Sequence, residues 1–416
     1  MSAEDPTGTP DAEPAPPRGG QVIHARQARV LAREAFASAG LPAEAAEQVA
    51  DALVITSLRG IDTHGLRLLP QYLTELTTGV ARATASSIVV RDRGAGLLMD
   101  ADGSLGVLAG LSAARLAAER AAEFGVAAVG VRNSNHFGAA SVYTRQLARQ
   151  GLVGIALTSA ASRVAPYGGI EPLFGTNPIS VAAGGGDEEF ALDMATSQVC
   201  FGEVKQRRAE GHGLDGGWAT DRQGRPTSDP EEAYALSPLG GYKGQGLAMA
   251  VTLLGAVLTG TAPDWRLAQV GAGGAGRSRG IGHLVLALDP AAFTGTEDFG
   301  AGLTDLLATV RTAAAATDGP VLAPGDPQRA HERYRETRGI PLDSRTAAVL
   351  AEQAERLGVP GPVPASGPVG GTVRVATAAP VPGACDGNAF NASTAAAPST
   401  ASTASTASTA SEEVSA

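Results

Sequence analysis

The sequence predicts an α/β fold, because short apolar segments repeatedly give way to polar turns and then to helical patterns. Residues 126–131 are apolar and rich in valine, which suits a strand buried on both faces of a sheet. Residues 133–135 are polar and should end that strand, and residues 141–148 carry apolar side chains at helical spacing. Residues 152–158 form a second apolar strand that leads into a loop of small residues.

Composition is that of an ordinary soluble protein. The chain has 416 residues, of which 44% are hydrophobic, enough for one large core or two linked ones. The N-terminus is acidic and proline-rich and lacks the features of a signal peptide, and no apolar run approaches the roughly 20 residues that span a bilayer. We therefore expect a cytoplasmic protein with no membrane partner.

Charge and metal-ligand spacing exclude two further classes. The net charge of -10 argues against nucleic acid as a partner, because phosphate binding needs clustered Lys and Arg. Cys200 and Cys385 are too few and too far apart for a zinc cluster or a disulfide framework, so both are expected as free thiols. The six histidines show no metal-ligand spacing, and we expect no metal site.

The N-terminal part reads as a disordered leader followed by a helical hairpin. Residues 1–22 lack the apolar residues for a core, and residues 25–38 and 42–59 have amphipathic helical patterns. The second helix runs into a break, residues 57–72, that contains Arg59, His64 and Arg67. Guanidinium groups bind carboxylates in bidentate fashion, so this break predicts an anion site. Alternatively, the histidine caps a helix and the arginines are surface charges.

His136 is the leading candidate for acid-base chemistry. An alanine-rich helix is expected over 107–124, and the strand at 126–131 ends shortly before His136. Ligands bind at strand ends in open α/β sheets, and an imidazole exchanges protons near neutrality. The alternative is a histidine that caps the next helix or bonds within the turn.

Three further segments have the character of a cofactor site. Residues 159–169 and 174–178 are small and would let a flat ring or a pyrophosphate approach the backbone, unless they are ordinary surface connections. The strand at 190–192 ends at Asp193, which could orient an imidazole or hold a ribose hydroxyl, or could lie near a helix start. Lys243 stands in a glycine-rich loop before an apolar helix at 246–258, where it suits a phosphate contact or a solvated loop.

The C-terminal part contains one misleading motif and a low-complexity tail. Residues 271–276 match GxGxxG but precede a strand at 283–288 and not a helix, so we interpret them as a flexible loop. Helices are expected over 300–316 and 344–357, separated by a turn at 321–326 that could close over a site. Residues 361–416 are Gly, Pro, Ala, Ser and Thr-rich and are interpreted as a disordered linker or tether.

Seven ordered motifs give the chain a specific resemblance. They are RGIDTHGLRLLPQY, GVRNSNHFGAASVY, VAPYGG, FGTNPIS, LDMATS, PLGGYKGQGLA and LAPGD. In this order, over about 23–360, the chain resembles the non-Rossmann malate/L-lactate dehydrogenase family, which also includes sulfolactate, ureidoglycolate and diketogulonate oxidoreductases and cyclic imino acid reductases. The resemblance implies one catalytic region over 23–360, a large mixed sheet with flanking helices, a nicotinamide cofactor held outside a Rossmann fold, and a homodimer that completes the active site.

The resemblance also assigns residues. His136 matches the proton acceptor and His64 the histidine of the helix break. Cofactor contacts fall on Asp193, Met194, Ala195, Lys243, Pro324, Gly325 and Asp326, and we add Thr176, Asn177 and Pro178 as wall residues. Ala160 stands where relatives usually carry serine, so only a backbone contact to the cofactor is expected there. Thr63 replaces a frequent serine but keeps a hydroxyl, and Gln245 replaces a common aromatic.

The hypothesis is an oxidoreductase that uses NAD or NADP and acts on a small 2-hydroxy acid or 2-oxo acid. His136 would take the hydroxyl proton, and His64 with Arg59 or Arg67 would hold the substrate carboxylate. One alternative is a reductase of cyclic 2-imino acids on the same fold, and another is a cofactor-binding protein without turnover. The sequence does not decide between NAD and NADP.

Overall fold

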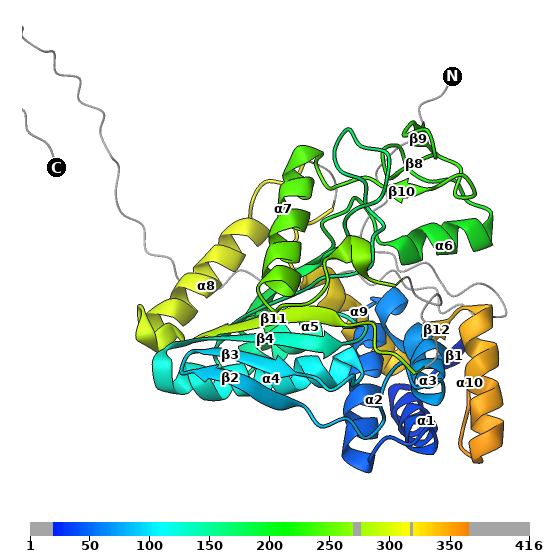
Figure 1. The fold of residues 1–416 in the computed structure, drawn as a ribbon, viewed down its shortest axis with the longest axis horizontal. Coiled ribbons are helices and arrows are strands. Elements are labelled where there is room, and N and C mark those ends of the chain that lie inside the picture. Colours follow the sequence, from blue (N-terminus) through cyan, green and yellow to red (C-terminus); the bar gives the residue numbers. More distant parts are fainter. Residues whose placement is uncertain (1–19, 269–275, 317–318, 366–416) are drawn as a thin grey trace, which may run out of the picture. The chain divides into compact units, whose positions relative to one another are not determined.

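The computed structural model describes residues 20–268, 276–316 and 319–365, which are built around a seven-stranded mixed sheet (Figure 1). The strand order is β2-β3-β4-β11-β5-β6-β7. β3 and β4 run parallel, and every other neighbouring pair is antiparallel. The predicted α/β class and the large mixed sheet are therefore confirmed. The strands are β2 (Ile88–Arg93), β3 (Gly96–Asp100), β4 (Val126–Ser134), β11 (Ile281–Leu288), β5 (Val153–Thr158), β6 (Ile179–Ala183) and β7 (Phe190–Met194).

Helices α4 (Gly106–Phe124) and α5 (Ser141–Ala148) pack on this sheet and carry the segment that holds His136 between them. Their buried faces are mainly alanine, together with Tyr143 and Leu147 of α5, and Phe137 from the segment before α5 packs in the same core. Small residues allow a close approach here: a Cβ on Gly110 of α4 would lie 2.4 Å from the Tyr143 ring. The close packing of α4 and α5 fixes the backbone on both sides of His136.

The N-terminal helices form a second core. Helices α1 (Ala25–Ser38) and α2 (Ala43–Leu58) pack together, as the predicted helical hairpin requires. A small sheet of order β12-β1-β13 lies beside them, formed by β12 (Ile340–Leu342), β1 (Gln21–Ile23) and β13 (Val363–Pro364). The other α-helices are α3 (Leu69–Thr77), α6 (Phe201–Glu210), α7 (Tyr242–Thr252), α8 (Thr296–Arg311), α9 (Asp326–Arg338) and α10 (Ser344–Leu357). α7 continues as a π-helical turn, Leu253–Val257. A third sheet is formed by the short strands Ala219–Thr220, Pro226–Thr227 and Ala235–Leu236.

Several predicted boundaries were wrong. β4 does not stop before residue 133 but continues through Ser134, because Asn133 adopts a φ of 54° and the pairing with β11 shifts between Ile281 and His283. Asn tolerates this left-handed conformation, so a polar residue does not end the strand. β7 likewise includes Asp193 and Met194. α7 begins at Tyr242, so Lys243 lies in its first turn and not in a preceding loop, and α8 begins at Thr296.

Some predictions fall where the structure gives no description. The leader up to residue 19, residues 269–275, which include 271–275 of the GxGxxG segment, and the tail from residue 366, with Cys385, lie outside the described residues. β1 includes two residues of the segment interpreted as leader, and β13 lies just inside the segment interpreted as tail. None of the helices in the described ranges has the length and apolarity needed to cross a membrane. Within the same ranges, no group of His, Cys, Asp and Glu side chains is arranged to hold a metal ion.

Candidate active site

His136 lies just past the end of β4, with one imidazole nitrogen held and the other open. Its Nδ1 is 2.9 Å from the hydroxyl of Tyr72 on α3, and the backbone N–H of Gly138 donates a long hydrogen bond of 3.4 Å to the same nitrogen. Among the described residues, no hydrogen bond involves Nε2. A hydroxyl can donate or accept, so Tyr72 can match either tautomer of the ring and leaves Nε2 available for a substrate.

His64 lies beside this ring at the end of the short 3-10 helix Asp62–His64. The two rings stack with centroids 5.8 Å apart and an interplanar angle of 18°. The hydroxyl of Thr63 bonds His64 Nδ1 at 2.9 Å. Thr63 replaces a frequent serine, and this bond uses the hydroxyl that the two residues share. Gly65 lets the break fold back onto α2, since a Cβ there would lie 2.0 Å from the Ser57 hydroxyl.

Both histidines are neutral in the ordinary pH range. Burial, followed by the charge on Arg279, lowers the pKa of His136 to about 4. Burial, followed by the charge on His136, lowers the pKa of His64 to about 3. Removal from water disfavours the charged imidazolium, so each ring has a lone pair free at neutral pH. Burial also raises the pKa of Tyr72 well above its usual value, which keeps its hydroxyl protonated.

The two predicted arginines are not equally available. Arg59 is 3% exposed, and its guanidinium is 3.0 Å from Glu189 and 2.9 Å from Glu332, so two carboxylates already balance its charge. Arg67 is partly exposed and bonds Asp343 at 3.0 Å and Gln206 at 3.1 Å. The helix break therefore brings His64 to His136, while the Arg59 side chain belongs to a buried ion network.

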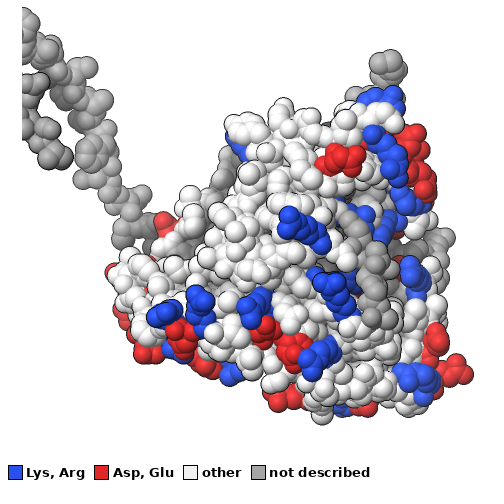
Figure 2. All heavy atoms as spheres, viewed as in Figure 1, with Lys and Arg blue, Asp and Glu red and all other residues white. Residues whose placement is uncertain are grey.

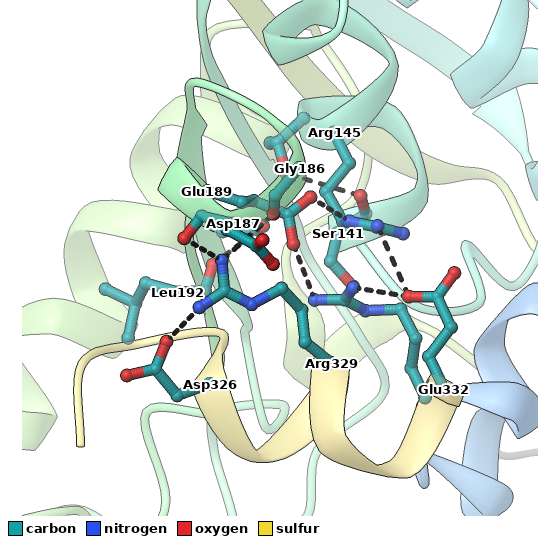
Figure 3. A network of polar contacts seen from close by, with 12 residues as sticks. Ser141, Arg145, Gly186, Asp187, Glu189, Leu192, Asp326, Arg329 and Glu332 are labelled. Atoms are coloured by element: carbon teal, nitrogen blue, oxygen red, sulfur yellow. Dashed lines mark hydrogen bonds and ion pairs between the residues drawn. The ribbon is translucent and has the colours of Figure 1, made fainter. Parts of the chain in front are cut away.

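That network joins α5, the segment just before β7, and α9 (Figure 3). Arg145 of α5 lies 2.5 Å from Glu189 and 3.6 Å from Glu332 of α9. Farther along α9, Arg329 bonds Asp326 and the backbone carbonyls of Gly186 and Asp187. Asp326 is also held by Arg311 at 2.9 Å and by the Ala323 N–H at 2.8 Å, so its carboxylate is engaged within the fold.

Most predicted cofactor segments meet along β7. The Asp193 carboxylate accepts a 2.8 Å hydrogen bond from the Ser141 N–H, so it caps the start of α5 while lying in a strand. Burial raises the pKa of this carboxyl, and the hydrogen bonds from Ser141 oppose the shift. Beside it, the Ala191 N–H donates to the Pro324 carbonyl at 3.0 Å, which seats the turn at Gly325 against β7.

The loops at the end of β7 are tied to one another. The Thr196 N–H donates to the Thr176 carbonyl at 2.8 Å, and the Leu239 N–H donates to the Thr196 carbonyl at 2.9 Å. Gln245 accepts a 2.7 Å hydrogen bond from the Tyr167 N–H and so links α7 to the small-residue loop. A groove of about 520 Å³ opens between these loops, and its lining includes Tyr167, Gly168, Gln198, Ser237, Pro238 and Gly241.

Three residues predicted to contact the cofactor differ in their surroundings within the fold. The Asn177 side chain is fully buried and donates to Asp264 at 2.7 Å and Thr252 at 3.0 Å, so it anchors its loop and does not face a ligand. Ala160 lies against Gly175, since a Cβ on that glycine would be 2.5 Å from the Ala160 carbonyl oxygen. Lys243 is exposed and has no hydrogen bond or ion pair within the described part of the chain.

Sequence reasoning missed several residues of the site. Tyr72 was part of a quoted motif, but its contact with His136 spans 64 positions and has no local signal. Arg279 and Glu75, which pair at 2.7 Å, were not recognised, and Arg279 follows the motif that was set aside. Helix α6 was also missed; a Cβ on its Gly202 would lie 3.1 Å from the Thr63 side chain, which places this helix next to His64.

Comparison with known proteins gives consistent results. The profile of a family described as Malate/L-lactate dehydrogenase matches residues 23–351. L-sulfolactate dehydrogenase of Methanocaldococcus jannaschii is 33% identical over 331 residues, 77% of this chain and 92% of that protein. The (2R)-3-sulfolactate dehydrogenase (NADP(+)) of Chromohalobacter salexigens is 38% identical over 277 residues, 66% and 83% of the two chains. Ureidoglycolate dehydrogenase (NAD(+)) of Escherichia coli O157:H7 is 33% identical over 317 residues, 75% and 90%.

Solved structures share the fold. Sulfolactate dehydrogenase from Methanocaldococcus jannaschii superposes with a TM-score of 0.75 at 31% identity, covering 81% of this chain and 98% of that one. The delta1-piperideine-2-carboxylate reductase from Pseudomonas syringae superposes with a TM-score of 0.72 at 30% identity, covering 80% and 100%. The similarity thus extends over nearly the whole of each relative.

Proposed function

The chain belongs to the malate/L-lactate dehydrogenase family, and we propose that it transfers a hydride between C2 of a small 2-hydroxy acid and NAD or NADP. It is an enzyme of the NAD(P)-dependent 2-hydroxy acid dehydrogenase type, since relatives are named as NAD(+) and NADP(+) enzymes. The observation that carries the mechanism is the position of His136 just past β4, where Tyr72 holds Nδ1 and none of the described residues bonds Nε2. Burial lowers the pKa of this ring to about 4, which favours its neutral form.

His136 acts as the proton acceptor in this proposal. Its Nε2 takes the proton of the substrate hydroxyl as the C2–H bond breaks, and the electron pair of that bond leaves as hydride. The products are a 2-oxo acid and protonated His136, whose Nδ1–H donates to Tyr72. In the reverse direction Nε2–H returns the proton to the carbonyl oxygen. The nicotinamide, when bound, supplies the hydride acceptor or donor.

The cofactor is held by segments that the fold brings together. Asp193, Met194 and Ala195 on β7, and Pro324, Gly325 and Asp326 in the adjoining turn, are the proposed contacts. The Thr176 to Pro178 loop and Ala160 provide backbone surface, while the Asn177 side chain only anchors the loop. Lys243 suits a phosphate, because an exposed ammonium in the first turn of α7 adds to the favourable helix N-terminus.

Two groups from the helix break are proposed to face the substrate. His64 stacks on His136 and so lines the same space. Arg67 is preferred to Arg59 as a contributor from this segment, because both Glu189 and Glu332 already neutralise Arg59.

We propose that the working form is a homodimer, supported by an exposed apolar face. Met249, Leu253 and Val257 recur at helical spacing along α7 and its continuation and are 50%, 56% and 59% exposed. Figure 2 shows a mostly white surface in the upper left part of the molecule, where α7 lies, while most charged side chains lie across its lower part and at its upper right. Exposed apolar patches of this kind are typical of association sites.

One alternative on the same fold is favoured by a specific observation. A relative of known structure is a reductase of delta1-piperideine-2-carboxylate, a cyclic imine that carries a carboxylate. Such a reduction needs the same hydride and one proton, and His136 could supply the proton to the ring nitrogen. The same residues could therefore serve the reduction of a C=O bond or of a C=N bond.

The test is an absorbance assay of reduced nicotinamide with purified protein. Malate, lactate, sulfolactate and ureidoglycolate are each tried with NAD and NADP, and the reverse direction is run with 2-oxo acids and cyclic imino acids. We expect turnover of at least one 2-hydroxy acid with one cofactor preferred. Turnover of an imine alone would move the chain to the reductase activity, and silence across the panel would contradict both.

A further inference from the structure

Arg279 lies beside His136 although it comes from a distant part of the chain. Its backbone N–H donates to the Asn135 side chain at 2.9 Å, and the neighbouring Ser278 hydroxyl donates to the Ser134 carbonyl at 3.2 Å. Ile281 pairs with Ser134 at the start of β11. These contacts fix Arg279 against the segment that precedes His136.

On its other side, Arg279 meets the helix that supports His136. Its Nη2 lies 2.7 Å from Glu75 Oε1. Glu75 is one helical turn from Tyr72 on α3, and Tyr72 bonds His136. Arg279, Glu75, Tyr72 and His136 therefore form one continuous cluster.

The ion pair within this cluster is incomplete. The Arg279 side chain is 8% exposed and that of Glu75 is 4% exposed, yet only one hydrogen bond joins them. Arg279 Nε and Glu75 Oε2 are both buried and have no partner among the described residues. Arginine pairs readily with a carboxylate through two parallel bonds, and a buried donor is seldom left unpaired. The open Nε–H is therefore free for another acceptor.

Glu75 supplies the carboxylate of this cluster, but it does not cancel the effect of Arg279 on the pKa of His136. The charge on Arg279 is, after burial, the second cause of the lowered pKa of His136. The positive charge of Arg279 disfavours protonation of the His136 imidazole, and an anion bound to Arg279 would oppose that effect.

We propose that Arg279 binds the C1 carboxylate of the substrate through its unpartnered Nε–H, close to His136, whose Nε2 receives the hydroxyl proton. This rests on the proposed function. C1 is bonded directly to the reacting C2, so the group that binds its carboxylate must lie near the proton acceptor. Arg279 meets this condition and has a free buried donor, whereas Arg59 is neutralised by two carboxylates.

The proposal has a consequence for the pH profile. The groups that face His136 are Tyr72 and Glu75 from α3, His64 from the helix break, His283 from β11, and Arg279. Of these, only Arg279 would change its electrostatic effect when an anion binds to it. The acid limb of kcat, which reports the substrate complex, should lie at higher pH than that of kcat/KM, which reports the free enzyme.

The test compares Arg279→Met with Arg277→Met, an exposed arginine on the same segment. Each full-length variant is assayed with the best 2-hydroxy acid of the panel and with the primary amide of that acid, which has no C1 charge. We expect Arg279→Met to lower kcat/KM for the acid about a hundredfold, the scale of a lost charge-assisted contact, and to change the amide reaction little. Arg277→Met should resemble the wild type with both substrates.

Folding is controlled by two further variants. The double variant Glu75→Gln with Arg279→Met leaves no uncompensated buried charge, and Arg279→Lys keeps the charge but not the fork of donors. Like Arg279→Met, both variants should lose the preference for the acid over the amide. An equal fall with both substrates, or none, would overturn the role of Arg279 while leaving the proposed function in place. A wild type that is silent with every 2-hydroxy acid would instead overturn the function and this inference together.

Discussion

The imidazole of His136 combines two properties that the sequence could not show together. Its place after a strand was predictable from the apolar run and the polar turn. Its neutral state depends on burial, and the position of its ring depends on Tyr72, whose hydroxyl reaches Nδ1 at 2.9 Å. Such contacts depend on the packing of distant segments, so periodicity along the chain carries no information about them.

The role of Asn177 also depends on a distant segment and could not be predicted from the sequence. Its place in a loop of small residues favoured a role in the cofactor wall, yet its amide is fully buried and bonds Asp264. A buried polar group requires partners. The aspartate that supplies them lies 87 positions away, so the structural role could not be recognised from the loop alone.

His283 gives a prediction for stability against pH. Its side chain is fully buried on β11 and bonds Thr158 at 2.7 Å, and burial, then the charge on His136, lowers its pKa to about 3. The unfolded chain, with a histidine pKa of about 6.5, binds a proton that the folded chain does not. The contribution to stability is therefore complete above about pH 6.5 and decreases as the pH falls toward the folded pKa.

We expect His283→Asn, which can keep the bond to Thr158, to reduce the dependence of unfolding free energy on pH by about 1.4 kcal/mol per pH unit between pH 6 and pH 5. Urea unfolding at several pH values measures this slope. His212→Asn is the control, because His212 is exposed. An unchanged slope in His283→Asn would show that this ring is not the source of acid sensitivity.

At the level of elements, helices with an apolar stripe were predictable and helices with a charged buried face were not. The bounds of α1, α5 and α10 agree with the sequence patterns. Helix α9 was missed because it packs through charges: Glu332 meets Arg59 and Arg145, and Arg335 meets Asp62. Hydrophobic periodicity, the main signal for a helix, is absent from such a face.

The ion network at α9 should hold these elements in place. Glu189→Gln would leave Arg59 and Arg145 with only Glu332 to balance two guanidinium groups that are at least nine-tenths buried. Breaking a buried ion pair costs about 3 to 5 kcal/mol, so we expect a loss of unfolding free energy on that scale.

Urea unfolding of Glu189→Gln against wild type tests this expectation. Glu119→Gln is the matched control, because Glu119 pairs with Arg115 on the exposed face of α4. Surface pairs contribute between zero and about 1 kcal/mol, so the control should differ little from wild type. Equal effects of the two substitutions would mean that the buried network adds no more than a surface pair.

For the whole molecule, local patterns predicted the class and the resemblance predicted a mixed sheet, but neither gave the strand order. β11 inserts between β4 and β5 as an antiparallel strand although more than a hundred residues separate it from either. This insertion brings Arg279 and His283 to His136. The site is thus assembled by the topology, and its residues could be recognised only in part along the sequence.

The proposed homodimer makes a prediction at the same scale. Light scattering should give twice the 41.7 kDa mass of one chain. Leu253→Glu combined with Val257→Glu places two charges on the apolar face of the π-helical turn that continues α7 and should give single chains. Val90→Glu on β2, which is also exposed, is the control and should leave the mass unchanged. A wild type with the mass of one chain would contradict the homodimer.

The central claim is that hydride leaves C2 of a 2-hydroxy acid while His136 takes the hydroxyl proton. The most direct measurement uses the substrate deuterated at C2 and follows both the rate and the label in wild type, His136→Ala and the exposed control His212→Ala. We predict that the wild type and the control deliver deuterium to the reduced nicotinamide, and that His136→Ala does so about a hundredfold or more slowly, the scale of a lost general base. Deuterium released to water, or a folded His136→Ala that is as fast as wild type, would contradict the claim.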